Sequence, residues 1–234
     1  MTVDRDQLKR AAAQGALHYV TDGMVLGLGT GSTASFVVQA LGARMASGLK
    51  IIGIPTSERT ATLARSLGIP LATFAEYQRI DLTIDGADEV ERGSLNLIKG
   101  LGGALLREKI VAAASRRLIV VVDQEKLVDR LGVKTPIPVE VVQFGWQSTA
   151  AALEKLAATP RLRHAAEDHP FITDGGNYIL DCRFGGIADA RSLEARINAI
   201  VGVVECGLFV GRSSDVIVAT TDGVEVLTPA GETS

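Results

Sequence analysis

Three short segments combine glycines with hydroxyl, carboxylate or lysine side chains, the residue types that bind and transform small anionic or polyhydroxylated ligands. They are Gly27-Leu28-Gly29-Thr30-Gly31-Ser32-Thr33, Asp85-Gly86-Ala87-Asp88-Glu89 and Lys99-Gly100-Leu101-Gly102-Gly103. The first two follow apolar runs of strand length, and the third opens a helix. Because ligands of open α/β sheets bind beyond the carboxyl ends of the strands, we expect the first two segments to share one edge of a sheet.

The segment at 27–33 lies between a predicted strand and a predicted helix. A dinucleotide fingerprint would need glycine at position 32, where Ser32 stands, and a P-loop would need a Gly-Lys pair that the segment lacks. What remains is a glycine turn whose N–H groups and hydroxyls suit an anion or a polyol. Its candidate binding residues are Thr30, Gly31, Ser32 and Thr33. The alternative is a plain turn with a Ser or Thr N-cap.

Asp85 and Asp88 stand in the turn that leaves the predicted strand at 80–84. Two crowded carboxylates can converge on one ligand, and crowding raises the pKa of one of them, which suits acid–base work or hydroxyl binding. Two alternatives stay open for this pair: a helix cap beside a solvated acid, and a magnesium site.

Lys99 precedes a glycine turn, and Glu108 lies about two turns into the helix that this turn opens. A lysine beside such a turn can stabilise a developing oxyanion. Glu108 can act as a general base if apolar neighbours such as Leu105 raise its pKa, the alternative being an exposed helix acid. Lys126 follows the apolar run 118–122 and is a candidate for a phosphate or hydroxyl contact, with a surface lysine as its alternative.

Strands and helices alternate around these segments. The pattern predicts helices over 4–20, 32–46, 57–67 and 103–115, and strands over 24–28, 50–54, 80–84, 118–122, 215–219 and 224–227. Such alternation is typical of an α/β fold with a Rossmann-like, mostly parallel sheet. After Leu131 the pattern changes to strand, helix, hairpin (171–184), helix and strand. We therefore expect an α/β catalytic domain at 1–131 plus 206–234, with a smaller inserted α+β domain at 132–205.

Composition narrows the function classes. The chain has 234 residues, 47% of them hydrophobic, and a formal net charge of −3, which favours a globular protein without general attraction to nucleic acid or anionic lipid. Its histidines and cysteines form no metal-binding motif, so we expect no metal. Cys182 and Cys206 are expected to be buried thiols of a reducing compartment. With no membrane-spanning stretch and no apolar signal region, we expect a cytoplasmic protein that binds neither nucleic acid nor membrane.

Taken in order, these segments resemble ribose-5-phosphate isomerase of the A type. The matching stretches are GLGTGSTA from Gly27, PTSERT from Pro55, DGADE from Asp85, KGLGGALLREK from Lys99, PIPVEVV from Pro136, TDGGNYILD from Thr173, GLFV from Gly207 and TDGVE from Thr221. Any one of them is a weak signal. Their order matches the family over nearly the whole chain, and Glu108 follows Lys99 by nine residues as in the family.

The resemblance implies an aldose-ketose isomerase that interconverts D-ribose 5-phosphate and D-ribulose 5-phosphate through an enediolate, in the non-oxidative pentose phosphate pathway. It implies no metal or organic cofactor, and a homodimer or homotetramer. Glu108 matches the base that moves a proton between C1 and C2, Lys99 the group that stabilises the enediolate, and Asp85 a residue that assists ring opening and shuttles protons. The residues that match substrate contacts are Lys9, Thr30, Gly31, Ser32, Thr33, Asp85, Gly86, Ala87, Asp88, Lys99, Gly100, Leu101, Gly102 and Lys126.

Two positions depart from the family pattern. Leu101 stands where some relatives have glycine, so its N–H is expected to be less free, and Glu125 directly precedes Lys126, where a smaller residue is common. Two rival classes are a sugar-phosphate deaminase or CoA transferase on a related fold, and a sugar-phosphate sensor that lost catalysis. The first would need a different acid–base set, often with a histidine, and the second a DNA-binding segment. An intact Glu108 favours the isomerase.

Overall fold

A six-stranded sheet forms the centre of the molecule. The computed structural model describes residues 4–165 and 169–229. The strand order is β14-β13-β6-β3-β1-β2, and every neighbouring pair is parallel except β13 and β14, which confirms the predicted α/β class. The strands are β1 (Val25–Leu28), β2 (Ile52–Pro55), β3 (Leu82–Asp85), β6 (Leu118–Asp123), β13 (Asp215–Thr220) and β14 (Gly223–Leu227).

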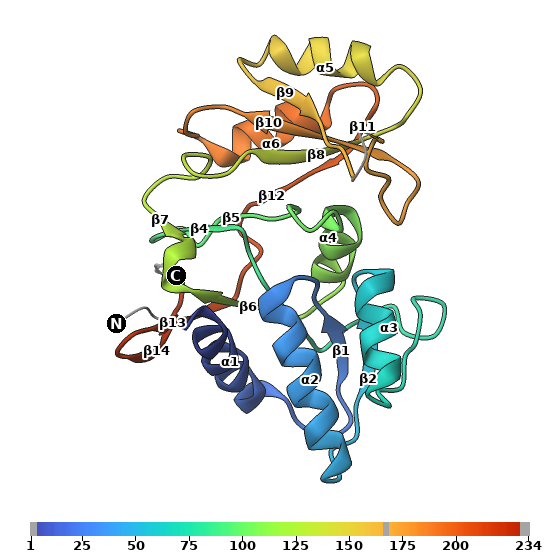
Figure 1. The fold of residues 1–234 in the computed structure, drawn as a ribbon, viewed down its shortest axis with the longest axis vertical. Helices are drawn as coiled ribbons and strands as arrows, with labels where there is room; N and C mark the ends of the chain where they lie inside the picture. The colour runs from blue at the N-terminus through green and yellow to red at the C-terminus, as the bar shows by residue number, and fades with distance from the viewer. Residues whose placement is uncertain (1–3, 166–168, 230–234) are drawn as a thin grey trace.

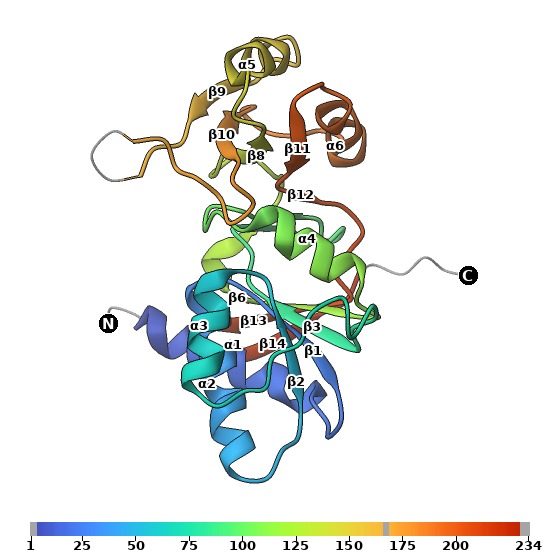
Figure 2. The ribbon, with the colours of Figure 1, turned by 90° about the vertical axis from the view of Figure 1, so that its right-hand side faces the viewer.

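Helices cover both faces of this sheet (Figures 1 and 2). Side chains of β6 alternate between the two faces, because successive residues of a strand point in opposite directions. Ile119 and Val121 pack in the core beneath α1, α2 and α3, whereas Val120 and Val122 pack in the core on the α4 side. The helical elements of this part are α1 (Arg5–Ala16), η1 (Leu17–Tyr19), α2 (Ser32–Ala46), α3 (Glu58–Ser66), α4 (Leu105–Ala113) and η2 (Gln124–Lys126).

A second sheet lies above the first in Figure 1 and has a core of its own. Its order is β11-β8-β10-β9, with every neighbouring pair antiparallel. We call this sheet and its two helices the small unit, and the six-stranded sheet with α1–α4 the large unit. The elements of the small unit are β8 (Ile137–Val141), α5 (Trp146–Glu154), β9 (Thr159–Leu162), β10 (Tyr178–Arg183), α6 (Ala190–Asn198) and β11 (Val203–Cys206).

The predicted hairpin over 171–184 is wrong in its first arm. A tight turn is present, because Thr173 N–H donates to the carbonyl of Asn177 and Gly176 N–H to that of Thr173. The residues before this turn form no strand, and β10 pairs instead with β8 and β9. The backbone of Phe171 is drawn away from β10, since its N–H donates to the carbonyl of Arg163.

A third sheet, which the sequence pattern does not predict, lies between the two units (Figure 1). Its order is β12-β5-β4-β7. Strands of two or three residues are too short to show an alternating pattern. Its members are β4 (Glu89–Glu91), β5 (Leu97–Ile98), β7 (Leu127–Val128) and β12 (Leu208–Phe209).

Two buried charged residues tie the units together. Glu89 accepts N–H groups from Gly132, Lys134 and Thr135, and so fixes the chain where it runs toward β8. Lys109 of α4 donates to Glu194 of α6 at 2.9 Å and to Glu205 of β11 at 2.8 Å. Because α4 also carries Glu108, the small unit is anchored beside a predicted catalytic residue. The domain boundaries proposed from the sequence stay predictions.

Among the residues that the structure describes, no helix has both the length and the apolar character needed to cross a membrane. Cys182 and Cys206 are free and buried, and burial raises the pKa of both thiols.

Candidate active site

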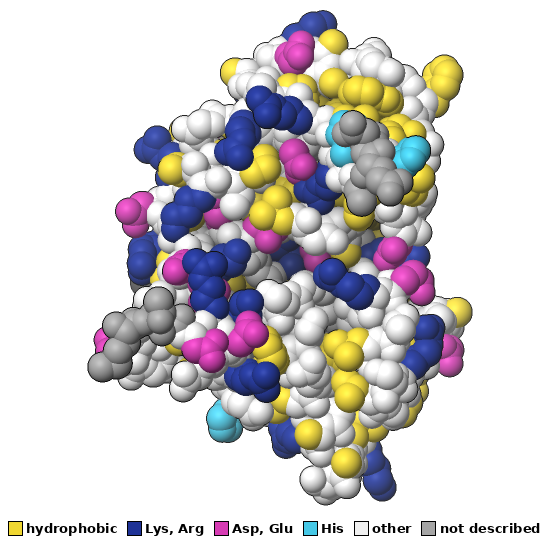
Figure 3. Space-filling model, viewed as in Figure 1, with side chains coloured by type: hydrophobic (Ala, Val, Ile, Leu, Met, Phe, Trp, Pro, Cys, Tyr) yellow, Lys and Arg dark blue, Asp and Glu magenta, His cyan; other side chains and the backbone are white. Residues whose placement is uncertain are grey.

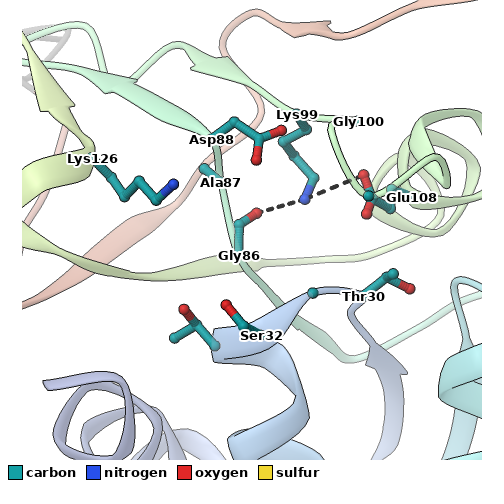
Figure 4. A pocket seen from close by; sticks show the side chains of 12 residues that line it. Thr30, Ser32, Gly86, Ala87, Asp88, Lys99, Gly100, Glu108 and Lys126 are labelled. Carbon is teal, nitrogen blue, oxygen red and sulfur yellow. Dashed lines mark hydrogen bonds and ion pairs between the residues drawn. The ribbon is translucent and has the colours of Figure 1, made fainter. Parts of the chain in front are cut away.

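The three segments singled out in the sequence meet at the carboxyl ends of β1 and β3. Figure 4 shows their side chains around one pocket, with Lys99 reaching across it toward Glu108. Helix α2 begins at Ser32, directly beneath this pocket. The residue before it, Gly31, has a φ of +122°. The pocket is lined by Thr30, Gly31, Ser32, Thr33, Gly86, Ala87, Asp88, Lys99, Gly100, Gly102, Glu108 and Lys126, all of them predicted site residues.

Asp85 lies buried beneath this pocket, where β1 and β3 approach closely. A Cβ atom on Gly29 would lie 2.3 Å from Oδ1 of Asp85, so only glycine fits there. The same oxygen accepts the N–H groups of Thr30 at 3.0 Å and Gly86 at 2.8 Å. The carboxylate is thereby fixed from the β1 side and from its own turn.

Lys99 lies between the two buried carboxylates. Its Nζ atom is 3.0 Å from Oδ2 of Asp85 and 3.4 Å from Oε2 of Glu108, and it donates to the carbonyl of Gly86. Burial opposes the charge, but Asp85 and Glu108 together raise the pKa of Lys99 above its ordinary value. The site therefore holds a permanent ammonium group.

Glu108 is 3% exposed, so it is not the solvated helix acid of the alternative interpretation. Its Oε2 atom accepts no hydrogen bond from the described residues. Burial raises the pKa of Glu108 to about 8, with Asp85 and Asp88 adding to the effect and Lys99 opposing it.

Asp85 and Glu108 compete for one ammonium group. Burial also raises the pKa of Asp85, against the opposing effects of Lys99, Gly86 N–H and Thr30 N–H. Three donors favour the charged form of Asp85, whereas Glu108 has only the Lys99 ammonium beside it. Near neutral pH, therefore, the ligand-free site holds charged Lys99 and a largely protonated Glu108.

The same contacts bear on the magnesium alternative. Both oxygens of Asp85 are engaged, one by two N–H groups and the other by Lys99. Of the second aspartate, Oδ2 of Asp88 accepts the N–H of Leu101 at 2.9 Å. These contacts oppose a magnesium ion shared by Asp85 and Asp88.

Two predicted contacts are placed differently from expectation. The Thr30 hydroxyl points away from Lys99 in Figure 4 and lies in a buried cluster with the hydroxyls of Thr56, Ser57 and Thr60. Leu101 does not line the pocket, and its N–H donates to Oδ2 of Asp88 at 2.9 Å. Both residues stabilise the site from outside the pocket. The Thr30 hydroxyl is hydrogen-bonded within the buried cluster, and the Leu101 N–H is taken up by the carboxylate of Asp88.

A second cavity, lined by four basic and three acidic side chains, adjoins the pocket and shares Ser32, Thr33, Asp88 and Lys126 with it. Lys9 lines this cavity rather than the first. Glu125, which the sequence marked as a disturbance beside Lys126, is paired with Arg5. Figure 3 shows Lys and Arg side chains gathered around the hollow between the units.

Residues from outside the three segments complete the arrangement. Ser57, which caps α3, also holds the Thr30 hydroxyl. Arg163 of the small unit donates to the carbonyls of Gly100 and Leu101. No motif in the sequence marks Arg163, since it is more than 60 residues from the turn that it contacts.

Comparison with known proteins agrees with this geometry. The family model of ribose 5-phosphate isomerase A (phosphoriboisomerase A) matches residues 52–223. The chain belongs to this family. A ribose-5-phosphate isomerase A of Gloeobacter violaceus is 63% identical to it, over 97% of this chain and 99% of that relative. The relative from Gluconobacter oxydans is 55% identical, over 95% and 96% of the two chains.

Solved structures of the family superpose on nearly the whole chain. Ribose 5-phosphate isomerase A of Methanocaldococcus jannaschii has a TM-score of 0.92 at 44% identity, covering 96% of this chain and 100% of that one. A D-ribose-5-phosphate isomerase in complex with phospho-erythronic acid has a TM-score of 0.93 at 40% identity, covering 97% and 100%. The chain is thus an aldose-ketose isomerase that interconverts D-ribose 5-phosphate and D-ribulose 5-phosphate, a step of the pentose phosphate pathway.

Proposed function

We propose that Glu108 is the general base of this isomerisation and that Lys99 stabilises the enediolate. The observation that carries the proposal is the Oε2 atom of Glu108, which is buried, free of hydrogen bonds from the described chain and 3.4 Å from the Lys99 ammonium. A carboxylate oxygen that accepts no hydrogen bond can take a proton from carbon. The adjacent cation can then stabilise the oxyanion that forms.

The reaction then runs in three proton movements. Glu108 takes the C2 proton of the open-chain aldehyde, the C1–C2 double bond forms, and the carbonyl electrons move to O1 beside Lys99. A proton passes from O2 to O1, with Asp85 as the proposed shuttle, which also assists ring opening. Glu108 finally returns its proton to C1 while the carbonyl forms at C2.

The phosphate is proposed to lie over the N-terminus of α2. Gly31, Ser32 and Thr33 present backbone N–H groups there, and such groups favour anions. Lys126 lines both cavities and Lys9 the outer one, so both are proposed phosphate contacts. Asp88 and the backbone of Gly86, Ala87, Gly100 and Gly102 are proposed to hold the sugar hydroxyls.

Four further properties belong to the same proposal. The reaction needs no redox centre, and we infer that it uses neither metal nor organic cofactor. Phe144 and Val201 of the small unit are 95% and 94% exposed, which supports a homodimer or homotetramer. Two free thiols support a reducing, cytoplasmic location. The formal net charge of −3 supports a protein without nucleic-acid or membrane partners. The two units support domains at 1–131 plus 206–234 and at 132–205.

The test replaces Glu108 with glutamine, which keeps the shape and removes the basicity. Glu108→Gln should bind ribose 5-phosphate nearly normally but lose most of its turnover, and it should not exchange the C2 proton of the substrate into deuterium oxide. Glu154→Gln, at an exposed glutamate of α5, is the matched control and should behave as wild type. C2 exchange at the wild-type rate in Glu108→Gln would move the base role to Asp85.

A further inference from the structure

Arg163 reaches from the small unit onto the turn that separates Lys99 from Glu108. Its guanidinium group forms a forked ion pair with both carboxylate oxygens of Asp181 on β10. The remaining nitrogen, Nη1, donates to the carbonyl of Gly100 at 2.9 Å and to that of Leu101 at 3.1 Å. One arginine, itself held by a carboxylate, therefore fixes two successive peptide groups of the active-site turn.

Because the peptide bond is planar, these two contacts also determine where the N–H groups of Leu101 and Gly102 point. In a trans peptide the C=O and the following N–H point to opposite sides. The carbonyl of Gly100 faces Arg163, and accordingly the N–H of Leu101 faces the other way and donates to Asp88 at 2.9 Å. In the next peptide the carbonyl of Leu101 faces Arg163, which turns the N–H of Gly102 away from the small unit.

The N–H of Gly102 is the donor that this orientation leaves available to a ligand. Gly102 lines the pocket together with Lys99 and Glu108. Its N–H donates to no acceptor in the part of the chain that the structure describes. An unpartnered N–H beside a lysine at a pocket is available to a substrate oxygen.

The turn is held from the same side by a second contact. A Cβ atom on Gly103 would lie 2.4 Å from Cζ of Phe171, so the phenyl ring packs directly against the backbone there. The guanidinium carbon of Arg163 lies 5.8 Å from the centre of that ring. Gly100 itself has φ +105°, a conformation that the turn must maintain. The small unit therefore acts as a clamp on residues 100–103.

We propose that Arg163 is a positioning residue for the isomerisation. It sets the orientation of two peptide groups, so that Leu101 N–H holds Asp88 and Gly102 N–H points at an oxygen of the reacting sugar. The proposal rests on the proposed binding role of this pocket, but it does not depend on which residue is the base. It also gives the small unit a part in catalysis, although that unit contributes no residue to the pocket lining.

The contact geometry requires arginine. A lysine carries one nitrogen and has no planar fork, so it cannot pair with both oxygens of Asp181 and still donate to two carbonyls. A substitution that keeps the charge therefore should not restore function. Asp181→Asn offers a milder change, because it keeps the shape and weakens the hold on Arg163.

The experiment compares Arg163→Met, Arg163→Lys and Asp181→Asn with Arg183→Ala, whose arginine is exposed on β10. We measure kcat, KM, the melting temperature, and calorimetric affinity for 4-phospho-D-erythronate, a stable anion that resembles the enediolate. Arg163→Met and Arg163→Lys should lose about ten- to hundredfold in kcat/KM, mostly in kcat, as expected when a reacting group is misplaced. Affinity for the phospho-erythronate should fall by a similar factor. Asp181→Asn should show a smaller loss, and Arg183→Ala none.

Two results would overturn the proposal. One is a lowered melting temperature with unchanged kcat, KM and analogue affinity, which assigns Arg163 to stability alone. The other is full rescue by lysine, which assigns it a simple charge effect. If Arg163→Met does not fold, Asp181→Asn and Arg163→Lys decide by the same readouts. Failure of the Glu108 assignment leaves these tests intact, because calorimetric affinity does not require turnover.

Discussion

The Nζ atom of Lys99 and the Oε2 atom of Glu108 lie 3.4 Å apart in a site where both side chains are 3% exposed. A buried ammonium beside a buried, raised-pKa carboxyl group separates two tasks that an isomerase must perform close together. One group must accept a proton from carbon, and the other must hold the charge that the proton leaves behind.

Replacement of Lys99 by alanine should lower kcat by a factor on the order of 10²–10³, the range for loss of one stabilising donor in a transition state. KM should change much less, because the phosphate end keeps Lys126. Lys155→Ala, at an exposed lysine after α5, is the control and should leave both constants unchanged. Steady-state kinetics give the answer, and a change confined to KM would show that Lys99 is a uniform binding contact.

The pH dependence of kcat/KM should show an acid limb governed by Glu108. The free enzyme needs this carboxyl group deprotonated, and burial raises its pKa to about 8. The value of kcat/KM should therefore rise with pH, reach half its plateau near pH 8 and level off above about pH 9. Initial rates at substrate concentrations far below KM measure this limb. A profile that is flat between pH 6.5 and 9 would contradict a protonated Glu108 in the ligand-free enzyme.

Glu108 should also make the folded protein less stable as the pH rises. The folded state holds the Glu108 proton more tightly than the unfolded state, so stability falls from about pH 4.5 to about pH 8. Glu108→Gln removes this dependence, and its melting temperature should exceed that of wild type by more at pH 9 than at pH 5. Thermal melts at both values test this. Equal differences at both values would refute it, and Glu154→Gln should show no such pH trend.

The sequence predicted those parts of the site that depend on local pattern. Asp85, Lys99 and Glu108 each follow or precede a glycine turn at the end of a periodic element, so their types and spacing revealed them. Their burial did not follow from the pattern, and the exposed-acid alternative for Glu108 is excluded only by the packing of α4 beneath the small unit. The α/β fold was predictable for the same reason, because its strands and helices carry clear periods.

Contacts between distant segments were not predictable. Thr30 turns its hydroxyl toward Thr56, Ser57 and Thr60. This arrangement exists only because the start of α3 packs against the turn that follows β1, where Thr60 donates to the carbonyl of Gly29. Arg163 reaches Gly100 only once the small unit is seated on α4. The third sheet likewise consists of strands too short to carry a period.

Chelation should leave activity unchanged. Both oxygens of Asp85 already have donors, one of them the Lys99 ammonium, and Oδ2 of Asp88 accepts the N–H of Leu101. Enzyme dialysed against EDTA should keep its full kcat and KM in chelator-treated buffer. A loss that magnesium restores would revive the metal-site interpretation of the two aspartates.

Gly31 and Gly48 offer a paired test of the phosphate site, because they flank the two ends of α2. Both have positive φ, +122° and +107°, and a Cβ atom on either meets nothing within 4 Å. Alanine therefore strains the backbone at both positions without a steric clash. At Gly31 the φ of 122° and ψ of 175° define a conformation that essentially only glycine adopts, and the strain there is about 1–3 kcal/mol. Gly31→Ala distorts the loop whose N–H groups are proposed to bind phosphate, so KM for ribose 5-phosphate should rise severalfold or more. Gly48→Ala should also lower the melting temperature and leave KM at the wild-type value. If both variants keep that KM while both lose stability, the loop at 27–33 only caps α2, and the phosphate must be held by the lysines alone.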